Sequence, residues 1–270
     1  MGLGKQIRLN RIFGNPSGRL CSVAVDHLVS YQQGLPQGLT NVPETIATLM
    51  KGKPDAITMY KGMAEHAWGP YAGSIPLIIT SIAFTLDDTI MHQLARPSEC
   101  IPLGADAISA AITLRSSREG DYLKMLAGIV EEARPYELPV IAHIYPRDFR
   151  NGPRIVHDPE NILWAVRCGI ECGADVIKVP YTGSPDTFRE IIATSPVPVV
   201  AAGGPKADSL LEALRLMAGV IQAGARGATI GRNIWGDPDP ARALLAFKHV
   251  IHDGLSAADA LTQSETAPLP

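Results

Sequence analysis

The sequence predicts a single-domain α/β protein, a (β/α)8 or TIM barrel, from three observations. Short apolar runs recur along the chain at intervals of roughly 20–35 residues, which is the spacing of βα units. Helical patterns fill the intervals between them, as right-handed crossovers between parallel strands require. The first run ends in Val25-Asp26-His27 without the glycine-rich turn of an open dinucleotide-binding sheet. The chain has 270 residues, and a barrel needs roughly 250.

Eight apolar runs are predicted to be the barrel strands. Because they are apolar on both faces, they suit a parallel sheet that is covered by helices. The runs are Ser22–Val25, Ala56–Met59, Leu77–Ser81, Ala107–Thr113, Val140–Tyr145, Val176–Val179, Val197–Ala202 and Ala228–Ile230. Helical patterns between them include Glu119–Ala133, Asn161–Cys172, which follows the start signal Asp158-Pro159, and Ser209–Ala223.

The chain outside the barrel is short. Residues 1–20 are expected to form a preliminary segment packed on the barrel, and residues 21–255 the barrel itself. Residues 256–270 lose periodicity and are expected to be a mobile C-terminal tail that begins as a frayed helix. No composition break suggests a second domain.

Composition narrows the class of protein. A net charge of −3 with 46% hydrophobic residues is typical of a soluble globular protein, and it gives no electrostatic case for nucleic acid or a membrane as partner. No run reaches the roughly 18 apolar residues of a membrane span and no leader opens the chain, so a cytoplasmic protein is expected. The four cysteines form no C-x-x-C pair, which favours buried free thiols over a structural zinc site.

Lys178 is the residue that most needs an explanation. It lies inside the apolar run Val176–Val179, where neither face of a covered parallel strand meets water. Burial disfavours the ammonium, which makes the neutral amine available to attack a carbonyl. The sequence therefore indicates a Schiff-base nucleophile, with a structural ion pair to Asp26 or another carboxylate as the alternative.

Tyr145 and Asp26 end two other predicted strands. Active sites of barrels lie at the carboxyl ends of the strands, so both side chains are expected near Lys178. A phenol can move protons at a substrate hydroxyl, and a carboxylate can position it or act as base. The alternatives are a packing role for Tyr145 and a turn cap for Asp26. His27, His143 and Arg147 end the same strands as polar neighbours, and Arg147 is a candidate second anion contact.

The loops after the last two predicted strands favour a phosphate site. Barrels often bind phosphate there through backbone N–H groups. Gly203 and Gly204 let the backbone approach closely, and Gly231 does the same beside the cation Arg232. The alternative is that the glycines only turn the chain and Arg232 makes a salt bridge.

These segments together resemble the class I aldolases of the archaeal fructose-bisphosphate aldolase type, within the DeoC/LacD-like aldolases. The resemblance runs in order from about residue 8 to 250. It rests on Val23–His27, Ile144–Arg147, Gly173–Gly183, Gly203–Lys206 and Gly231–Trp235. It implies a metal-free, cofactor-free lyase with the Schiff base on Lys178, proton transfer by Tyr145, support from Asp26, and phosphate on Gly203, Gly204, Gly231 and Arg232. It also implies a phosphorylated sugar or ketone as substrate, and a homo-oligomer.

Three departures from that pattern lie at the expected substrate mouth, and they bear on the substrate rather than on the lysine. Leu28 replaces a glycine, Ala202 replaces a serine, and His143 replaces an aromatic residue. One alternative is an acyl or ketol transferase on the same scaffold, similar to the hydroxy-phosphonooxypentanedione thiolase or the aminodideoxyheptulosonate synthases. Another is a phosphosugar-binding protein without turnover. A metal-dependent aldolase using His27 and His143 is disfavoured because a third ligand is missing.

Overall fold

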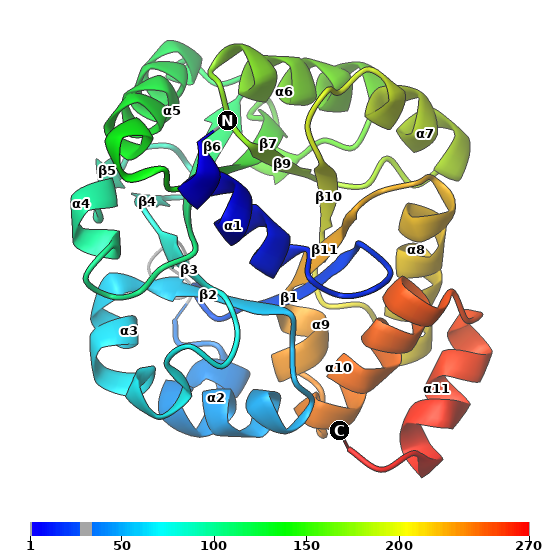
Figure 1. The fold of residues 1–270 in the computed structure, drawn as a ribbon. Coiled ribbons are helices and arrows are strands. Elements are labelled where there is room, and N and C mark those ends of the chain that lie inside the picture. The colour runs from blue at the N-terminus through cyan, green and yellow to red at the C-terminus, as the bar shows by residue number, and fades with distance from the viewer. Residues whose placement is uncertain (1, 28–33, 270) are drawn as a thin grey trace.

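The computed structural model describes residues 2–27 and 34–269 and shows a closed barrel of parallel strands (Figure 1). Each barrel strand pairs with the next one along the chain, and the last pairs with the first. The predicted (β/α)8 fold is confirmed, because every predicted run overlaps one barrel strand. These strands are β1 (Leu20–Ala24), β2 (Ala56–Tyr60), β3 (Leu77–Thr80), β6 (Ala107–Leu114), β7 (Val140–Asp148), β9 (Val176–Val179), β10 (Val199–Ala202) and β11 (Gly227–Ile230).

Helices surround the strands (Figure 1). Helix α6 begins after Asp158, as predicted, and the side chains of Asn41, Asp158, Ser209 and Asp239 each accept a first-turn N–H at the start of a helix. The α-helices are α1 (Leu3–Ile12), α2 (Val42–Lys51), α3 (Lys61–Ala67), α4 (Pro97–Cys100), α5 (Glu119–Ala133), α6 (Pro159–Glu171), α7 (Pro185–Ala193), α8 (Leu210–Gln222), α9 (Arg232–Trp235), α10 (Pro240–Lys248) and α11 (Ala257–Thr266). Single turns of other helix types are η1 (Gln37–Leu39), η2 (Gly69–Tyr71), η3 (Arg134–Tyr136) and the π-helical η4 (His249–Asp253).

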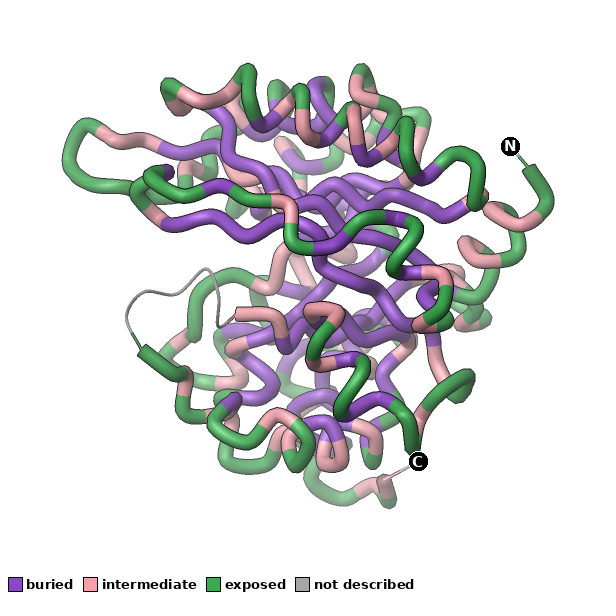
Figure 2. The backbone as a smooth tube through the Cα atoms, turned by 90° about the vertical axis from the view of Figure 1, so that its left-hand side faces the viewer, coloured by how far each residue is buried: buried purple, intermediate pink, exposed green. Residues whose placement is uncertain are grey.

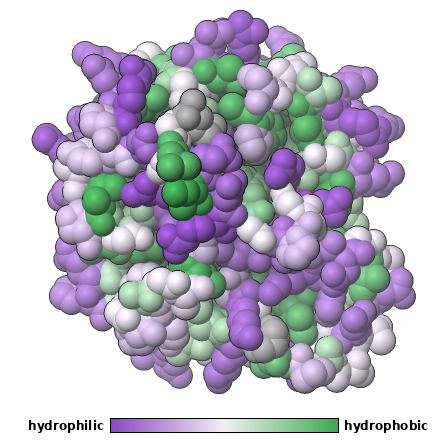
Figure 3. All heavy atoms as spheres, viewed as in Figure 1, coloured by the Kyte–Doolittle hydropathy of each residue, from purple (hydrophilic) through white to green (hydrophobic). Residues whose placement is uncertain are grey.

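Helix α1 covers the N-terminal end of the barrel and crosses the centre of the view in Figure 1. Ile12 is fully buried there, and Leu9 and Phe13 pack against the same cluster. The cluster contains one inward side chain from most strands: Leu20, Ala56, Ile78, Ala107, Ile141, Val176 and Val200. The face that α1 covers carries hydrophilic and hydrophobic groups side by side (Figure 3). The barrel therefore has an apolar floor at this end, and its site must lie at the other end.

The floor fixes which side chains face the barrel interior. Side chains alternate along a strand, so residues two and four positions beyond a floor residue also point inward. Val176 on β9 is followed by Lys178, and Ile141 on β7 is followed by His143 and Tyr145. The interior is thus apolar at the floor and polar above it, where Ser22 donates to Thr229 at 2.8 Å.

Within the described residues, three strands lie outside the barrel, and none of them was predicted. After β3 the chain forms an antiparallel hairpin of β4 (Ile82–Phe84) and β5 (Met91–Gln93), and β8 (Arg154–Ile155) folds back on β7. Buried residues lie at the centre of the molecule, and exposed segments extend beyond the barrel at the end away from α1 (Figure 2). These additions lengthen the wall around that end.

Helix α11 contacts α8 and α10 and buries Ala260. The mobility predicted for residues 256–270 stays a prediction. In the described part of the chain, no helix has the length and apolar character needed to span a membrane.

Candidate active site

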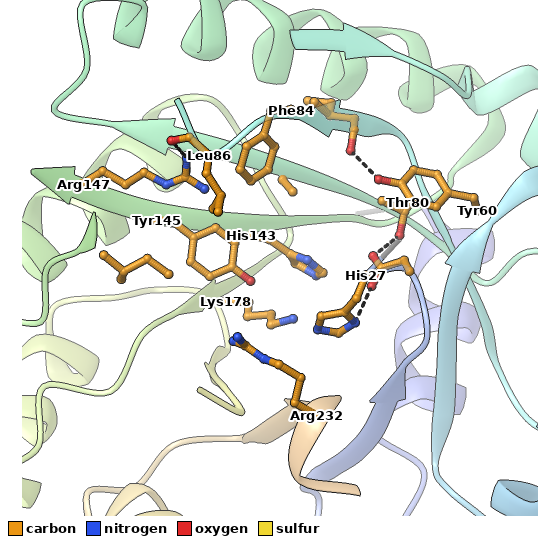
Figure 4. Close-up of a pocket in the computed structure, with 14 residues that line it drawn as sticks. His27, Tyr60, Thr80, Phe84, Leu86, His143, Tyr145, Arg147, Lys178 and Arg232 are labelled. Atoms are coloured by element: carbon orange, nitrogen blue, oxygen red, sulfur yellow. Dashed lines mark hydrogen bonds and ion pairs between the residues drawn. The ribbon is translucent and has the colours of Figure 1, made fainter. Parts of the chain in front are cut away.

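Every predicted site residue lines one cavity with two lobes at the carboxyl end of the barrel. Figure 4 shows the residues of the first lobe. The first, here called the β3 lobe, is a cavity of about 130 Å³ bounded by residues that include Asp26, His143 and Arg147. The second, the β10 lobe, is a cavity of about 240 Å³ bounded by residues that include Gly203, Gly204 and Gly231. Both far exceed the roughly 10–15 Å³ that one water needs. The lobes share His27, Tyr145, Ile155, Lys178 and Arg232.

Lys178 lies where the two lobes meet. Its residue is only 5% exposed, yet no carboxylate of the described residues lies within 4.0 Å of Nζ, and Nζ has no hydrogen bond to them. Burial lowers the pKa of Lys178 from 10.5 to about 8, although Asp26 acts in the opposite direction. About a tenth of the amine is then neutral at pH 7, against fewer than one in about a thousand for an ordinary lysine. The ion-pair alternative is not what the described residues show.

Tyr145 lies on β7 beside Lys178 and turns its hydroxyl toward it (Figure 4). Among residues 2–27 and 34–269, the hydroxyl has no hydrogen-bond partner, so it is not tethered as a packing tyrosine would be. Burial, together with the charge of Asp26, raises the pKa of the phenol. Tyr145 is therefore protonated at neutral pH and can donate a proton first.

Asp26 follows β1 and is held by its neighbours. Oδ2 accepts a hydrogen bond from Thr80 Oγ1 at 2.6 Å, and Oδ1 lies 3.6 Å from His27 Nδ1. Thr80 in turn accepts a hydrogen bond from Ser109 Oγ at 3.3 Å. The carboxylate is thus positioned in the β3 lobe by a strand that the sequence pattern did not connect with it.

Both histidines of the site are neutral near pH 7. Burial lowers the pKa of His27 to about 4 and holds the pKa of His143 well below its usual range. His143 lies directly opposite Lys178 in the register of β7 with β9, and the His27 ring stands edge-on to Trp235 at 5.3 Å. No group of three His, Cys, Asp or Glu side chains arranged to hold a metal occurs in the described residues.

The glycines of the β10 lobe form a close-fitting backbone surface. A side chain at Gly231 would place Cβ 2.3 Å from His27 Cε1, and Gly204 has φ of +71°. The N–H groups of Gly204 and Gly231 donate to no acceptor in the described part of the chain. Arg232 Nη2 donates to the Gly204 carbonyl at 3.0 Å, which ties the two loops together.

Asn233 holds the same surface from behind. Its buried amide donates to the carbonyls of Gly203 and Pro205 at 2.9 and 2.8 Å, and its oxygen accepts from the Ala207 N–H at 2.9 Å. In the sequence, Asn233 drew attention only as part of the segment Gly231–Trp235. Its position directly after Gly231-Arg232 could have suggested that it links the two loops.

Arg147 lines the β3 lobe, but its guanidinium already has partners. Nη1 donates to the carbonyls of Leu86 and Thr85 at 2.8 and 3.3 Å and lies 3.6 Å from Asp88 Oδ1. Its role as an anion contact stays a prediction, and these contacts are those of a residue that holds a loop in place.

Sequence reasoning missed the walls of the cavity. Thr80, Phe84 and Leu86 come from β3 and its hairpin, and Ile155 and His157 come from β8 and its loop. The rule that strand ends carry site residues pointed toward Thr80, because it lies next to the end of the predicted run Leu77–Ser81 and is the last residue of β3. Of the three departures, Ala202 and His143 line the cavity, and Leu28 lies outside the described residues.

A buried lysine without a close counter-charge at the carboxyl end of a (β/α)8 barrel has the surroundings that Schiff-base chemistry requires. The family model of the DeoC/LacD family aldolases matches residues 20–237, and the chain belongs to this family.

The relatives agree with that assignment. The 2-amino-3,7-dideoxy-D-threo-hept-6-ulosonate synthase of Halobacterium salinarum is 32% identical over 97% of this chain and 96% of its own. The class 1 fructose-bisphosphate aldolase of Thermoproteus tenax is 30% identical over 87% of this chain and 92% of its own.

A solved structure is similar as well. It is described as an archaeal fructose-1,6-bisphosphate aldolase with the catalytic lysine covalently bound to the carbinolamine intermediate of the substrate. It superposes with a TM-score of 0.79 at 29% identity, covering 92% of this chain and 99% of its own. This similarity agrees with membership of the DeoC/LacD aldolase family.

Proposed function

We propose that this protein makes or cleaves a carbon–carbon bond in a phosphorylated ketose through a Schiff base on Lys178. The observation that carries the proposal is a buried amine without a counter-charge within 4.0 Å among the described residues, facing a two-lobed cavity. A structural lysine would be buried with a partner, because an unpaired buried charge is costly. The relative with a catalytic lysine bound to a carbinolamine supports the same chemistry.

Tyr145 acts first as an acid in this mechanism. The neutral Lys178 amine adds to the substrate ketone, and the Tyr145 phenol protonates the carbinolamine oxygen, which leaves as water. The product is an iminium on Nζ and a phenolate on Tyr145. The phenolate then accepts the proton of the substrate hydroxyl as the carbon–carbon bond breaks. The electron pair of that bond moves into the iminium, which gives an enamine and an aldehyde.

Tyr145, which is a phenol again after cleavage, protonates the enamine carbon and so restores the iminium. Water then adds to the iminium, its released proton returns to the Tyr145 phenolate, and the ketone leaves the free amine of Lys178. Asp26 is held by the hydrogen bond from Thr80 beside the β3 lobe, where it positions the substrate hydroxyl or acts as base. The neutral imidazoles of His27 and His143 offer hydrogen bonds to substrate oxygens. Each step conserves protons within the site.

The phosphate of the ketone half is proposed to bind in the β10 lobe. Gly204 and Gly231 supply N–H groups there, Gly203 lets the backbone pass close, and Arg232 supplies the positive charge. Ala202, which lines the same lobe, has no hydroxyl to donate to that phosphate. Substrate would then extend from this cradle, across Lys178, into the β3 lobe.

Reductive trapping tests the proposal. Dihydroxyacetone phosphate with borohydride should leave a reduced adduct on Lys178, located by peptide mass spectrometry. Lys178→Met should give no adduct. Failure to trap any of a panel of phosphorylated ketones would overturn the proposal.

A transferase is the second candidate, because a relative at 32% identity is named as a heptulosonate synthase. A transferase would form the same Schiff base on Lys178 but would pass the bound fragment to a different acceptor molecule. Product analysis with and without an added aldehyde or coenzyme A separates it from a lyase. A phosphosugar-binding protein without turnover would instead show thermal stabilisation by ligand and no trapping. A homo-oligomer and a cytoplasmic location stay predictions.

A further inference from the structure

We propose that the β3 lobe receives an uncharged aldehyde, so that the substrate carries one phosphate, on its ketone half only. This inference rests on the proposed function, which places the ketone phosphate in the β10 lobe. It concerns the end of the cavity away from the glycines, where the sequence predicted that Arg147 would contact a second anion.

One wall of the β3 lobe is apolar. Ile82, Phe84 and Leu86 come from β4 and the loop after it, and Ile155 comes from β8 across the opening. Figure 4 shows Phe84 and Leu86 facing the cavity across from Tyr145 and Lys178. Such a surface gains by contact with carbon and offers a phosphate no donors.

Arg147 stabilises this wall. Its side chain is 3% exposed, and its guanidinium lies over the Phe84 ring at 4.8 Å while Nη1 donates to the carbonyls of Leu86 and Thr85. Both carbonyls belong to the loop that carries the wall. Arg147 is therefore a positioning residue for Phe84 and Leu86.

The charge of Arg147 is also compensated from behind. Asp88, which is buried, places Oδ1 3.6 Å from Nη1 and accepts a hydrogen bond from the Tyr122 hydroxyl at 2.9 Å. Arg118 donates to the Asp88 carbonyl at 3.1 Å, which anchors the turn. A phosphate that drew Arg147 away would leave the carboxylate of Asp88 buried without its cation, which is costly.

The remaining charges of the β3 lobe do not favour an anion at its far end. Asp26 lines this lobe and repels a second negative group. Lys178 and Arg232 lie on the border with the β10 lobe, where the iminium and the ketone phosphate use them. His27 and His143 are neutral near pH 7 because burial lowers the pKa of each. The sequence of residues 28–33, Leu-Val-Ser-Tyr-Gln-Gln, contains no cation.

The inference is tested in the direction of addition. The enamine carbon on Lys178 forms a bond to the aldehyde carbon, and the aldehyde oxygen takes the proton of Tyr145. With dihydroxyacetone phosphate as the fixed donor, the aldehydes glyceraldehyde and glyceraldehyde 3-phosphate differ at the far end by the phosphate alone. We expect kcat/KM to be on the order of 100-fold higher for the uncharged aldehyde, because the phosphate would be desolvated without a partner.

A charge introduced into the wall should reverse this preference. Leu86→Arg should raise the relative kcat/KM for glyceraldehyde 3-phosphate by about tenfold or more. Leu94→Arg makes the same change at a residue 37% exposed, which follows the same hairpin and does not line the cavity. It should leave the preference as it is. Equal effects of both substitutions would show a general charge effect and contradict the inference.

Donor trapping separates the two proposals, since it needs no aldehyde. If borohydride traps the donor on Lys178 but the unaltered protein prefers the phosphorylated aldehyde, the inference is wrong and the proposed function stands. If no donor is trapped, both are wrong. The aldehyde comparison on the unaltered protein decides the matter even if Leu86→Arg does not fold.

Discussion

Replacing Lys178 by methionine should make the protein more stable while abolishing its activity. Burial holds the pKa of Lys178 at about 8 in the folded protein, against 10.5 for an ordinary lysine. A pKa lowered by one corresponds to about 1.4 kcal/mol, so the charged lysine costs the folded state about 3 kcal/mol near pH 7. Lys178→Met removes that cost and keeps a side chain of similar length.

The pH dependence separates this cost from any gain in packing. Because the folded pKa is lower than the unfolded one, the cost is fully present below pH 8 and is lost as the pH rises through about 10.5. At pH 9.5 it should have fallen to about 1 kcal/mol. The advantage of Lys178→Met in free energy of unfolding should therefore shrink by about 2 kcal/mol between pH 7 and pH 9.5.

Urea denaturation followed by circular dichroism at both pH values measures the effect. Lys124→Met is the matched control, because Lys124 lies exposed on α5, and it should change stability by less than about 0.5 kcal/mol at either pH. A Lys178→Met protein that is less stable than the parent at pH 7, or whose advantage does not depend on pH, would refute the reasoning.

Three further predictions concern the chemistry and shape of the site. The rate of donor trapping by cyanoborohydride should rise about tenfold per pH unit at low pH and level off above about pH 8, and a break near 10.5 would contradict the low pKa of Lys178. Tyr145→Phe should lower kcat by roughly 10²–10⁴-fold with an unchanged circular dichroism spectrum, whereas near-parent turnover would exclude Tyr145 as the proton carrier. Gly231→Ala places Cβ 2.3 Å from His27 Cε1 and should cost about 1–3 kcal/mol of stability and weaken phosphate binding, while Gly128→Ala on α5, where a Cβ meets nothing within 4 Å, should be tolerated.

The barrel could be predicted because each strand is indicated by a short stretch of its own sequence. Each apolar run is bounded by turn residues, and α5 begins and ends at the predicted Glu119 and Ala133. Lys178 stood out for the same reason, since a cation inside such a run is visible without knowing any neighbour. The closed sheet then places Asp26, Tyr145 and Lys178 at one end, as the strand-end rule requires.

The walls of the cavity could not be predicted because they depend on contacts distant in sequence. Ile82–Phe84 continues the apolar run of β3, so the hairpin has no separate signal, and its turn contains Asp88 at φ of +58°. The partners of Arg147 are backbone carbonyls more than sixty positions earlier, and any residue type can supply a carbonyl. From the sequence alone, Arg147 at a strand end was therefore interpreted as a possible anion contact, because the carbonyls that it binds could not be identified.

Strand β7 explains how one scaffold can keep its lysine chemistry and change its substrate. Three inward residues rise along it from the floor: His143 opposite Lys178, then Tyr145, then Arg147 at the hairpin. In the proposed mechanism the first two face the bond that forms, and the third holds the wall that we propose meets the far end of the substrate. These three side chains are two residues apart along β7, so the wall lies further along the barrel than Lys178. A substitution in the β4–β5 hairpin can therefore change which aldehyde is accepted without moving the lysine amine. Aldehyde preference in this protein should thus respond to Phe84 and Leu86 while the rate of donor trapping on Lys178 does not.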